Sequence, residues 1–335
     1  MRVVVTGASS LIGQATVALL AARGDDVVTF QRHAATDIPD GIEQCLGDVT
    51  DADAVDAVVA GADAVIHLAA KVGVVGDRDA YVAVNVDGTQ HVIDAARRHR
   101  VAKVVHVSSP SVAHDGSAIV GGAAEPAVLD HGTGWYSETK AIAEEIALRA
   151  DDRSTGVLAV RPHLVWGPGD TQLVGRIVER AAAGRLALVG GGTALIDTTY
   201  IDNAATALVA ALDAVHPGAV CAGRAYVIAN GEPRPIRELV EGICAAAGVE
   251  FSPRDVPLAV ARGVGSVIER VWPRLGREDE PPLTRFLADQ LGTAHWFDPR
   301  PAHRDLGWSP TVSIDEGLVR LTEWFDDRRA DTARR

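Results

Sequence analysis

The chain has 335 residues, of which 47% are hydrophobic and 23% are charged, and its formal net charge is −13. These proportions match those of ordinary globular proteins, so they exclude disordered, collagen-like and disulfide-scaffold classes. The acidic balance argues against nucleic-acid binding. The length alone predicts roughly two domains.

The cysteines and the hydropathy pattern indicate the cellular setting. Cys45, Cys221 and Cys244 lie far apart, without a CxxC pair or metal-ligand spacing, which predicts reduced thiols and no metal site. No apolar stretch reaches the roughly 18 residues that a spanning helix needs, so no integral membrane segment is expected. The cytoplasm is the expected location.

The first 160 or so residues alternate short β-branched runs with longer alanine-rich segments, which is the pattern of a parallel sheet covered on both faces. The expected strands are Val3–Thr6, Val27–Phe30, Ala64–Leu68, Val104–Val107, Val157–Val160 and Arg224–Ala229. The expected helices are Leu11–Arg23, Thr50–Ala60, Val84–Arg98, Ser137–Ala150 and Asp202–Val215. This order predicts an α/β fold with a Rossmann-like, doubly wound parallel sheet.

The composition changes from Trp166 onward, where glycine and proline cluster and most tryptophans fall. A smaller, interleaved C-terminal substrate domain is expected. Residues 1–165 and 199–230 form the predicted NAD(P)-binding domain, residues 166–198 and 231–325 the predicted substrate-binding domain, and residues 326–335 a charged tail.

A glycine-rich turn follows the first expected strand. The segment Gly7-Ala8-Ser9-Ser10-Leu11-Ile12-Gly13 runs directly into a helix. Free backbone amides and the helix dipole make such a turn an anion site, which suits the pyrophosphate of a dinucleotide.

The second strand ends at Gln31 and Arg32, where NAD-specific proteins usually offer an acidic residue to the ribose hydroxyls. A cation here suits a 2′-phosphate, which favours NADP(H) over NAD(H). The alternative is that Arg32 is a solvated loop cation. Asp48, after an expected third strand, suits either the adenine amine or the cap of the next helix, or both.

Three polar residues suggest acid–base chemistry. Tyr136 and Lys140 are one helical turn apart on one face. A tyrosine that works near pH 7 needs its pKa lowered by about three units, about 4 kcal/mol, and one cation about 4 Å away at an effective dielectric constant near 20 supplies roughly that. Ser109 ends the strand Val104–Val107, at the sheet edge where ligands bind, and its hydroxyl suits a substrate oxygen.

Over essentially its whole length the chain resembles the extended short-chain dehydrogenase/reductases. The matching motifs are Thr6-Gly7…Gly13, Gly47-Asp48, Val65–Ala70, Asn85-Val-Asp-Gly88-Thr89, Ser108-Ser109, Tyr136…Lys140, Arg161-Pro162…Gly169 and Tyr200–Asn203. The resemblance implies that Ser109, Tyr136 and Lys140 are catalytic and that Asn85 braces the active-site backbone.

The same resemblance implies a set of cofactor-binding residues. They are Gly7, Ser9, Ser10, Leu11, Ile12, Gly13, Arg32, Asp48, Val49, Ala69, Ala70, Asn85, Tyr136, Lys140, Pro162, Leu164 and Val165. One departure is Ser10, which stands where the family's loop has its middle glycine. Its side chain either crowds the pyrophosphate or donates to it.

Within this family, the stretches Pro281–Asp298 and Arg304–Pro310 resemble the 3β-hydroxysteroid and sterol dehydrogenases. The stretches Ala70–Gly76, Arg161–Asp170 and Asp197–Asn203 resemble NADPH-dependent ketone reductases of bacterial olefin biosynthesis, which act on β-keto acids with two fatty chains. This implies reduction of a 3-oxo group on a long hydrophobic substrate. The alternatives are an NAD-linked 3β-hydroxysteroid or sterol dehydrogenase, a sugar-nucleotide epimerase or dehydratase, and a nucleotide-sensing binding protein.

A hydrophobic substrate requires an apolar cleft. The segment Val256–Leu275 has an apolar helical face, which fits a core helix, a lid or a membrane-surface contact. If the substrate has a carboxylate, Lys71 or His163 is positioned to face it, and Ser111 and Trp166 complete the expected substrate residues. A homodimer through residues 84–98 and 137–150, and membership of a biosynthetic assembly, are further expectations.

Overall fold

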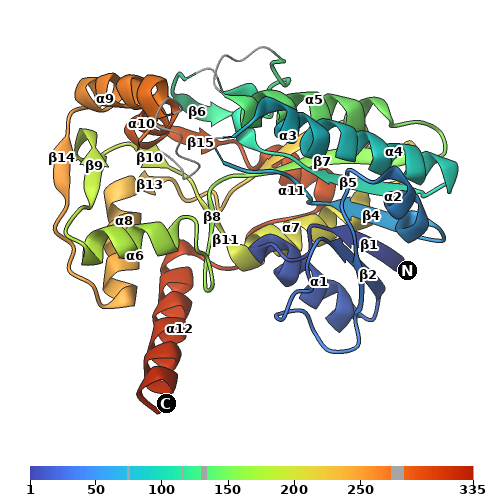
Figure 1. The fold of residues 1–335 in the computed structure, drawn as a ribbon, viewed down its shortest axis with the longest axis horizontal. Coiled ribbons are helices and arrows are strands. Elements are labelled where there is room, and N and C mark those ends of the chain that lie inside the picture. The colour runs from blue at the N-terminus through green and yellow to red at the C-terminus, as the bar shows by residue number, and fades with distance from the viewer. Residues whose placement is uncertain (74–75, 115, 130–133, 273–282, 335) are drawn as a thin grey trace.

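The computed structural model describes residues 1–73, 76–114, 116–129, 134–272 and 283–334. Its largest sheet has seven parallel strands in the order β12-β7-β5-β4-β1-β2-β3 (Figure 1). These strands are β1 (Arg2–Thr6), β2 (Asp26–Gln31), β3 (Glu43–Leu46), β4 (Ala64–His67), β5 (Lys103–Val107), β7 (Gly156–Pro162) and β12 (Ala225–Ile228). The predicted doubly wound parallel sheet is confirmed.

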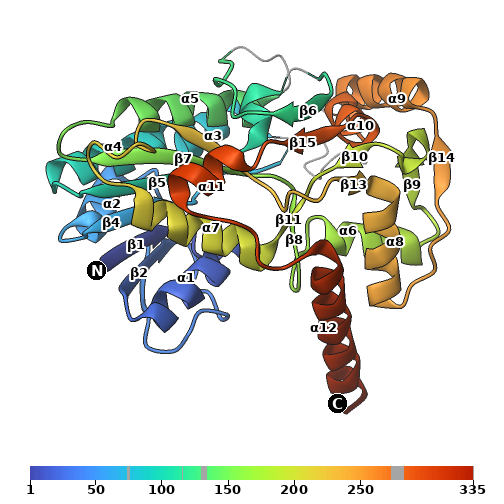
Figure 2. The same ribbon diagram turned by 180° about the vertical axis from the view of Figure 1, so that it is seen from behind.

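Helices cover both faces of this sheet (Figures 1 and 2). One face packs against α1 (Leu11–Arg23), α7 (Ile201–Ala214) and α11 (Arg300–Leu306), and the other against α2 (Ala52–Val59), α4 (Gly88–Arg98) and α5 (Trp135–Arg149). Successive strand residues alternate between the two cores, so Val3 and Val5 face α1 whereas Val4 faces α2. Burial on both faces explains why the strands read as continuous apolar runs.

A smaller sheet and several helices form the other side of the molecule. The sheet order is β13-β10-β15-β6. Its strands are β6 (Ile119–Gly122), β10 (Leu195–Ile196), β13 (Arg234–Pro235) and β15 (His295–Phe297), and two further parallel pairs join β8 (Val165–Trp166) to β11 (Thr199–Tyr200) and β9 (Ala187–Val189) to β14 (Arg254–Val256). The helices are α6 (Val174–Ala182), α8 (Ile236–Ala247), α9 (Leu258–Val271), α10 (Arg285–Gly292) and α12 (Ile314–Arg334).

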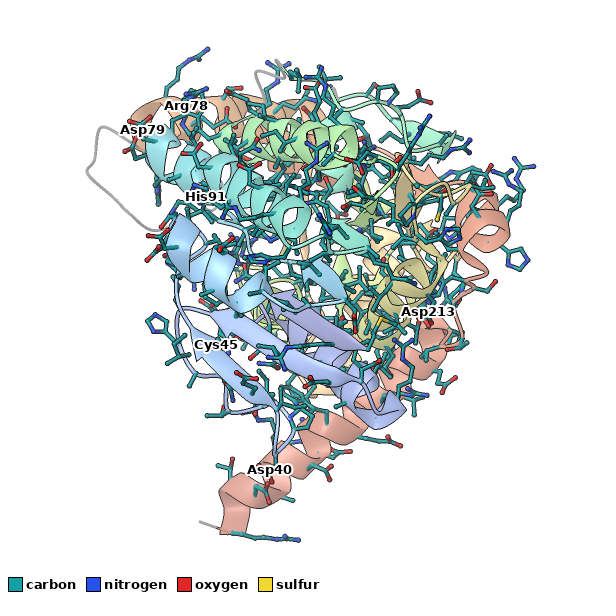
Figure 3. The ribbon with its side chains drawn as sticks, turned by 90° about the vertical axis from the view of Figure 1, so that its right-hand side faces the viewer. Asp40, Cys45, Arg78, Asp79, His91 and Asp213 are labelled. Atoms are coloured by element: carbon teal, nitrogen blue, oxygen red, sulfur yellow. The ribbon has the colours of Figure 1, made fainter. Side chains whose placement is uncertain are left out.

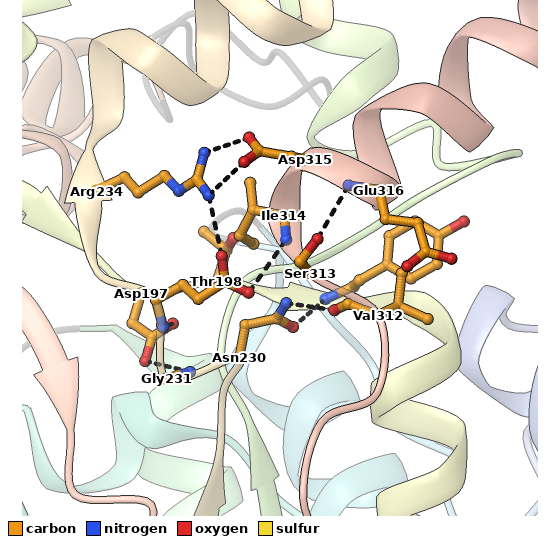
Figure 4. A network of polar contacts seen from close by, with 12 residues as sticks. Asp197, Thr198, Asn230, Gly231, Arg234, Val312, Ser313, Ile314, Asp315 and Glu316 are labelled. Carbon is orange, nitrogen blue, oxygen red and sulfur yellow. Dashed lines mark hydrogen bonds and ion pairs between the residues drawn. The ribbon is translucent and has the colours of Figure 1, made fainter.

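A buried polar joint connects the two sides just after β12 (Figure 4). The Asn230 side chain accepts hydrogen bonds from the Tyr200 backbone (3.0 Å) and the Asn203 side chain (2.9 Å) and donates to the Val312 carbonyl (2.9 Å). Beside it, Asp197 accepts from the backbone amide of Gly231 at 3.0 Å. These bonds fix the segment that leads into α12 against the carboxyl edge of the large sheet.

Four of the five expected helices begin one or two residues away from the predicted start. The helix expected at Thr50–Ala60 begins at Ala52, and its cap is Asp51, which accepts from the backbone amides of Asp53 and Ala54. Asp48 does not cap this helix, because its carboxylate accepts from Thr50 within the preceding turn. The helix expected at Val84–Arg98 is divided into a π-helix, η1 (Val82–Asp87), and α4.

The C-terminal third also differs from the sequence assignment. Residues 300–308, placed in the substrate domain by the sequence, pack against the core of the large sheet through Ala302, Leu306 and Trp308. Residues 326–334 of the charged tail continue α12, which extends away from the body of the molecule (Figure 1). The helix expected at Val256–Leu275 starts at Leu258, and Arg274 and Leu275 lie outside the described residues. Among the described residues, no helix has the length and apolarity needed to cross a membrane.

Candidate active site

The turn after β1 contains two glycines that tolerate no side chain. Gly7 has a φ of +69°, and a Cβ there would lie 2.6 Å from the backbone nitrogen of Ala69. A Cβ on Gly13 would lie 2.7 Å from the carbonyl oxygen of Gly7. The backbone is therefore tightly folded at the start of α1, where unpaired amides attract an anion.

Ser10 fits this turn without a glycine's freedom. Its φ of −73° is ordinary for any residue, and its hydroxyl donates to the Gly7 carbonyl at 2.9 Å while accepting from the Gly13 amide at 3.2 Å. The side chain therefore caps α1 and lies within the turn. Neither expectation for Ser10, crowding of a pyrophosphate or donation to it, describes this conformation.

The end of β2 offers a cation and no acid. Gln31 is buried, and its amide donates to the Gln44 side chain at 3.0 Å. Arg32 is exposed, and within the described ranges it has neither an ion pair nor a hydrogen bond. A guanidinium can bind a phosphate in bidentate fashion.

The loop after β3 is held in place by α4. His91, labelled in Figure 3, donates from Nδ1 to the Val49 carbonyl at 2.9 Å. A Cβ on Gly88 would lie 2.8 Å from a Val49 methyl group, so a glycine is needed for this close approach. Asp48 and Val49 are consequently fixed beside the carboxyl end of the sheet.

The other predicted cofactor residues surround the same edge. The Ala69 amide donates to the Thr6 hydroxyl at 3.2 Å, and Leu164 has a positive φ of +43°, a strained conformation that often marks functional sites. Ser9 is exposed, whereas Leu11, Ile12, Ala70, Pro162 and Val165 are half-buried.

Ser109 and Tyr136 meet at the carboxyl end of β5. Burial raises the pKa of the Tyr136 phenol above its usual range, and a hydrogen bond with the Ser109 hydroxyl opposes this rise. The Ser109 oxygen also accepts from the amide (3.2 Å) and the hydroxyl (3.0 Å) of Ser111, because Ser109 caps the short helix η2 (Pro110–Ala113). The sequence argument expected Lys140 to lower the pKa of Tyr136, and the structure instead shows a raised pKa.

Lys140 lies one turn further along α5 and is buried. Its ammonium donates to the Val107 carbonyl at 2.7 Å and lies 3.4 Å from Nε2 of His106. Burial lowers the pKa of Lys140 to about 8, although the negative charge of Glu144 opposes the shift. Glu144 itself forms a buried ion pair with Arg161, with Nε to carboxylate at 2.8 Å.

Asn85 connects the loop after β4 to α5. Its side chain accepts from the Lys71 amide (2.7 Å) and donates to the Lys71 carbonyl (3.1 Å) and the Thr139 hydroxyl (3.0 Å). It lies in the π-helix η1, a rare conformation that is frequent at functional sites. This geometry fits the bracing role expected for Asn85.

Two of the expected substrate residues remain plausible from their placement. The Lys71 ammonium lies 5.1 Å from the centre of the buried Tyr81 ring, on a loop beside the braced backbone. Ser111 is buried, and its hydroxyl donates to Ser109, so its direct contact is with the serine that is expected to be catalytic.

Two other expected substrate residues are unsuited to that role. His163 is buried, its Nδ1 donates to the Asp197 carbonyl, and burial lowers its pKa to about 4, so it is neutral and cannot pair with a carboxylate at neutral pH. Trp166 has no exposed surface, packs edge-on against Tyr200 and donates to Thr198 at 2.9 Å. Both side chains belong to the packed interior.

A cavity lies beside the loop that follows Ser109. It has a volume of about 200 Å³, and its lining combines apolar residues with two charged ones: Pro110, Ala113, Ile119, Val227 and Phe297, and Glu125 and Arg161. The cavity lies between the edge of the large sheet and the smaller sheet. It is therefore a partly apolar space close in sequence to Ser109.

Several residues of the site were not singled out from the sequence. They form or contact the buried polar network around Asn85 and Lys140, and they are Thr6, His67, Thr89, Thr139 and His106. His67 and Thr89 stand within the quoted motifs, but their partners lie far along the chain. Nothing in the sequence indicates that His106 faces Lys140.

The glycine turn, the serine–tyrosine–lysine arrangement and the doubly wound sheet define a nicotinamide-dependent short-chain dehydrogenase/reductase. The chain belongs to the 3-beta hydroxysteroid dehydrogenase/isomerase family, whose model matches residues 4–258.

Comparisons with individual proteins agree. The chain is 47% identical over 325 residues to the 2-alkyl-3-oxoalkanoate reductase of Stenotrophomonas maltophilia, covering 96% of this chain and 98% of that protein. It is 31% identical to a 3 beta-hydroxysteroid dehydrogenase/Delta 5-->4-isomerase of Mycobacterium tuberculosis, covering 97% and 90%. Its fold matches MoeE5 in complex with UDP-glucose and NAD, with a TM-score of 0.74, 24% identity and coverage of 98% and 99%.

Proposed function

We propose that this protein reduces the 3-oxo group of a 2-alkyl-3-oxoalkanoic acid to a 3-hydroxy group with NADP(H). The main support is the likeness to the Stenotrophomonas maltophilia reductase over 96% of the chain, together with an intact contact between Ser109 and Tyr136. A protein that only senses nucleotides has no need of such a pair.

The residues present fit a dinucleotide. The two glycines let the turn fold tightly against the backbone of Ala69 and of the turn itself, and the start of α1 supplies amides for a pyrophosphate. Arg32, which is exposed and has no ion pair among the described residues, favours the 2′-phosphate of NADP(H), and Gln31 offers no carboxylate to ribose hydroxyls. When bound, the cofactor supplies a hydride to the carbonyl carbon.

The chain's own residues supply the proton and hold the substrate. The Ser109 hydroxyl donates a hydrogen bond to the carbonyl oxygen, and the Tyr136 phenol donates the proton that this oxygen needs. Because burial raises the pKa of Tyr136, the phenol stays protonated near neutral pH, as an acid in the reducing direction must be. The nearby Lys140 ammonium stabilises the phenolate that remains.

We assign residues to the two parts of the substrate, its carboxylate and its hydrocarbon chains, by their charge and apolarity. We assign the carboxylate to Lys71, which stands on the loop braced by Asn85, and not to the neutral His163. We assign the hydrocarbon chains of the substrate to the apolar part of the cavity after Ser109. Lys71→Ala should raise KM for the 3-oxo acid about tenfold and leave neutral ketones unaffected, whereas an equal effect on both would contradict the assignment.

The decisive assay compares cofactors and substrates. Purified protein is given a racemic 2-alkyl-3-oxoalkanoic acid with NADPH or NADH, and separately a 3β-hydroxysteroid with NAD. We expect rapid NADPH oxidation on the keto acid, reduced about 10²- to 10⁴-fold in Tyr136→Phe. Activity confined to NAD and the steroid would overturn both the substrate and the cofactor.

Activity confined to NAD and the steroid would indicate the alternative function, that of an NAD-dependent 3β-hydroxysteroid or sterol dehydrogenase. Its support is the family model and the likeness to the Mycobacterium tuberculosis protein. The sugar-nucleotide alternative has only the fold of MoeE5 in its favour.

We also propose a homodimer through α4 and α5, a cytoplasmic location and membership of a biosynthetic assembly. Analytical ultracentrifugation of the purified protein tests the dimer, and a monomer at micromolar concentration would contradict it.

A further inference from the structure

Two buried histidines lie behind the catalytic lysine. His67 on β4 and His106 on β5 are paired in register, and their ring centres are 5.4 Å apart. Both side chains are buried on the face of the sheet that α5 covers. The proposed reaction uses neither of them directly, although each is close to a residue that it does use.

His67 has a complete set of hydrogen bonds. Its Nε2 lies 3.1 Å from the Thr89 hydroxyl, whose own proton goes to the Asn85 carbonyl, so Nε2 donates to Thr89. Its Nδ1 lies 2.7 Å from the Thr6 hydroxyl and accepts from it. His67 thus links the glycine turn to the π-helix, and its imidazole is neutral.

His106 is satisfied on one side only. Its Nε2 lies 3.4 Å from the Lys140 ammonium, and its buried Nδ1 has no hydrogen-bond partner in the part of the chain that the structure describes. An ammonium has only donors, so Nε2 must be the acceptor and Nδ1 must hold the proton. A buried N–H without a partner is costly, which makes this arrangement unusual for a residue that only fills space.

We propose that His106 is a positioning residue whose neutral imidazole accepts a hydrogen bond from Lys140 and keeps that buried lysine protonated for the reaction. This inference rests on the proposed function of Lys140. The Val107 carbonyl supplies a second acceptor, so two of the three ammonium protons are held and one is left for a bound cofactor. A hydrophobic residue in place of His106 would leave the ammonium with one acceptor inside the protein.

The charges around Lys140 are consistent with this role. Burial lowers the pKa of Lys140 to about 8, which is close enough to neutral pH for one hydrogen bond to matter. Burial, followed by the charge of Lys140, lowers the pKa of His106 well below its usual range, so the imidazole is uncharged. The titratable groups that interact with Lys140 are His67 on β4, His106 on β5 and Glu144 on α5, which is paired with Arg161 on β7. Tyr136 precedes Lys140 by one turn of α5.

The first test measures the pH dependence of unfolding and needs neither substrate nor cofactor. Urea unfolding of the wild type is compared with Lys140→Met from pH 6 to 10.5. The native lysine releases its proton near pH 8 and the unfolded one near pH 10.4, so the unfolded chain binds more protons between these values. The stability difference, wild type minus Lys140→Met, should therefore rise with pH, starting near pH 8.

The same comparison in a His106→Leu background measures the imidazole's contribution. Loss of a hydrogen bond to a charged group should move the start of the rise about one pH unit lower. His106→Gln, which keeps an acceptor, should restore the wild-type position. A rise that starts at the same pH in His106→Leu would overturn the proposal, even if the protein proves to be a reductase.

A second measurement uses the wild-type protein and does not depend on a folded leucine variant. With 15N-labelled histidine, the His106 signals are identified by their loss in His106→Gln. We expect the proton on Nδ1 throughout, and a shift of the Nε2 resonance near pH 8 that is absent in Lys140→Met. A proton on Nε2, or a signal that does not respond to Lys140, would overturn the proposal.

Discussion

Helices α5 and α9 have similar lengths, 15 and 14 residues, but they differ in which side chains they bury and which they expose. α5 buries polar residues one turn apart, and each has a partner, as Lys140 has Val107 and Glu144 has Arg161. α9 buries Ala261 and Gly265 and exposes a stripe of valines, Val260, Val264, Val267 and Val271.

This contrast shows that hydropathy alone does not decide what is buried in this protein. Burying a charge is costly in free energy unless the charge is paired. The protein nevertheless buries charged side chains on α5 and pairs them, because the proposed chemistry requires charges that are shielded from water. The valines of α9 contribute less stability than buried valines would, because 42–58% of the surface of each remains in water. The predictions below test this difference, beginning with the largest effect.

The Glu144–Arg161 pair should be the most sensitive point on the α5 side. Glu144→Leu leaves the buried Arg161 without its counter-charge, which should reduce the free energy of unfolding by about 3–5 kcal/mol in urea titrations. The matched control is Glu145→Leu, which removes the half-buried partner of the exposed Arg149 and should cost less than about 1 kcal/mol. Equal effects of the two substitutions would show that the buried pair is not needed for stability.

A substitution at Arg32 tests how the protein binds the 2′-phosphate of its cofactor. Arg32→Ala should raise KM for NADPH about tenfold, about 1.4 kcal/mol, since one charge-assisted contact to a phosphate is lost. KM for NADH should not change, and NADH is thus the control within the same variant. A parallel rise for both cofactors would mean that Arg32 supports the loop and does not read the 2′-phosphate.

A substitution at Ser111 tests whether Ser109, the proposed catalytic serine, depends on its hydrogen bond from Ser111. Ser111→Ala removes one hydrogen bond to the Ser109 oxygen, worth about 0.5–1.5 kcal/mol, and should lower kcat about three- to tenfold with KM for NADPH unchanged. Ser109→Ala is the reference for full loss of the serine and should be more severe. If Ser111→Ala raises the KM of the keto acid and spares kcat, Ser111 contacts substrate instead.

Local signals explain why much of the fold was predictable. The helix Leu11–Arg23 was predicted with its exact bounds, because Ser10 caps its start and Gly24 ends it in the left-handed conformation. The place of Ser109 at the carboxyl edge of the sheet followed from the apolar strand that precedes it. Each of these features depends on residues close together in sequence.

The errors concern contacts between distant segments. His163 was a candidate cation, but burial lowers its pKa to about 4, although its bond to the Asp197 carbonyl, 34 residues away, opposes this shift. Residues 300–308 return to the large sheet through Trp308, whose indole donates to Thr206 at 3.1 Å. The contact between Lys140 and His106 could likewise not be predicted, because in the sequence His106 is an ordinary residue of a strand.

The smallest effect is expected on the exposed stripe of α9. Val267 is 58% exposed, so Val267→Lys should change the free energy of unfolding by less than about 0.5 kcal/mol. Gly265→Ala, on the buried side of the same helix, is the matched comparison. A Cβ there would lie 2.6 Å from the Arg285 amide, and overpacking of this kind costs about 1–3 kcal/mol. Urea titrations of both variants separate the two faces. A loss for Val267→Lys as large as that for Gly265→Ala would mean that the valines pack against another surface and that α9, like α5, is a buried helix.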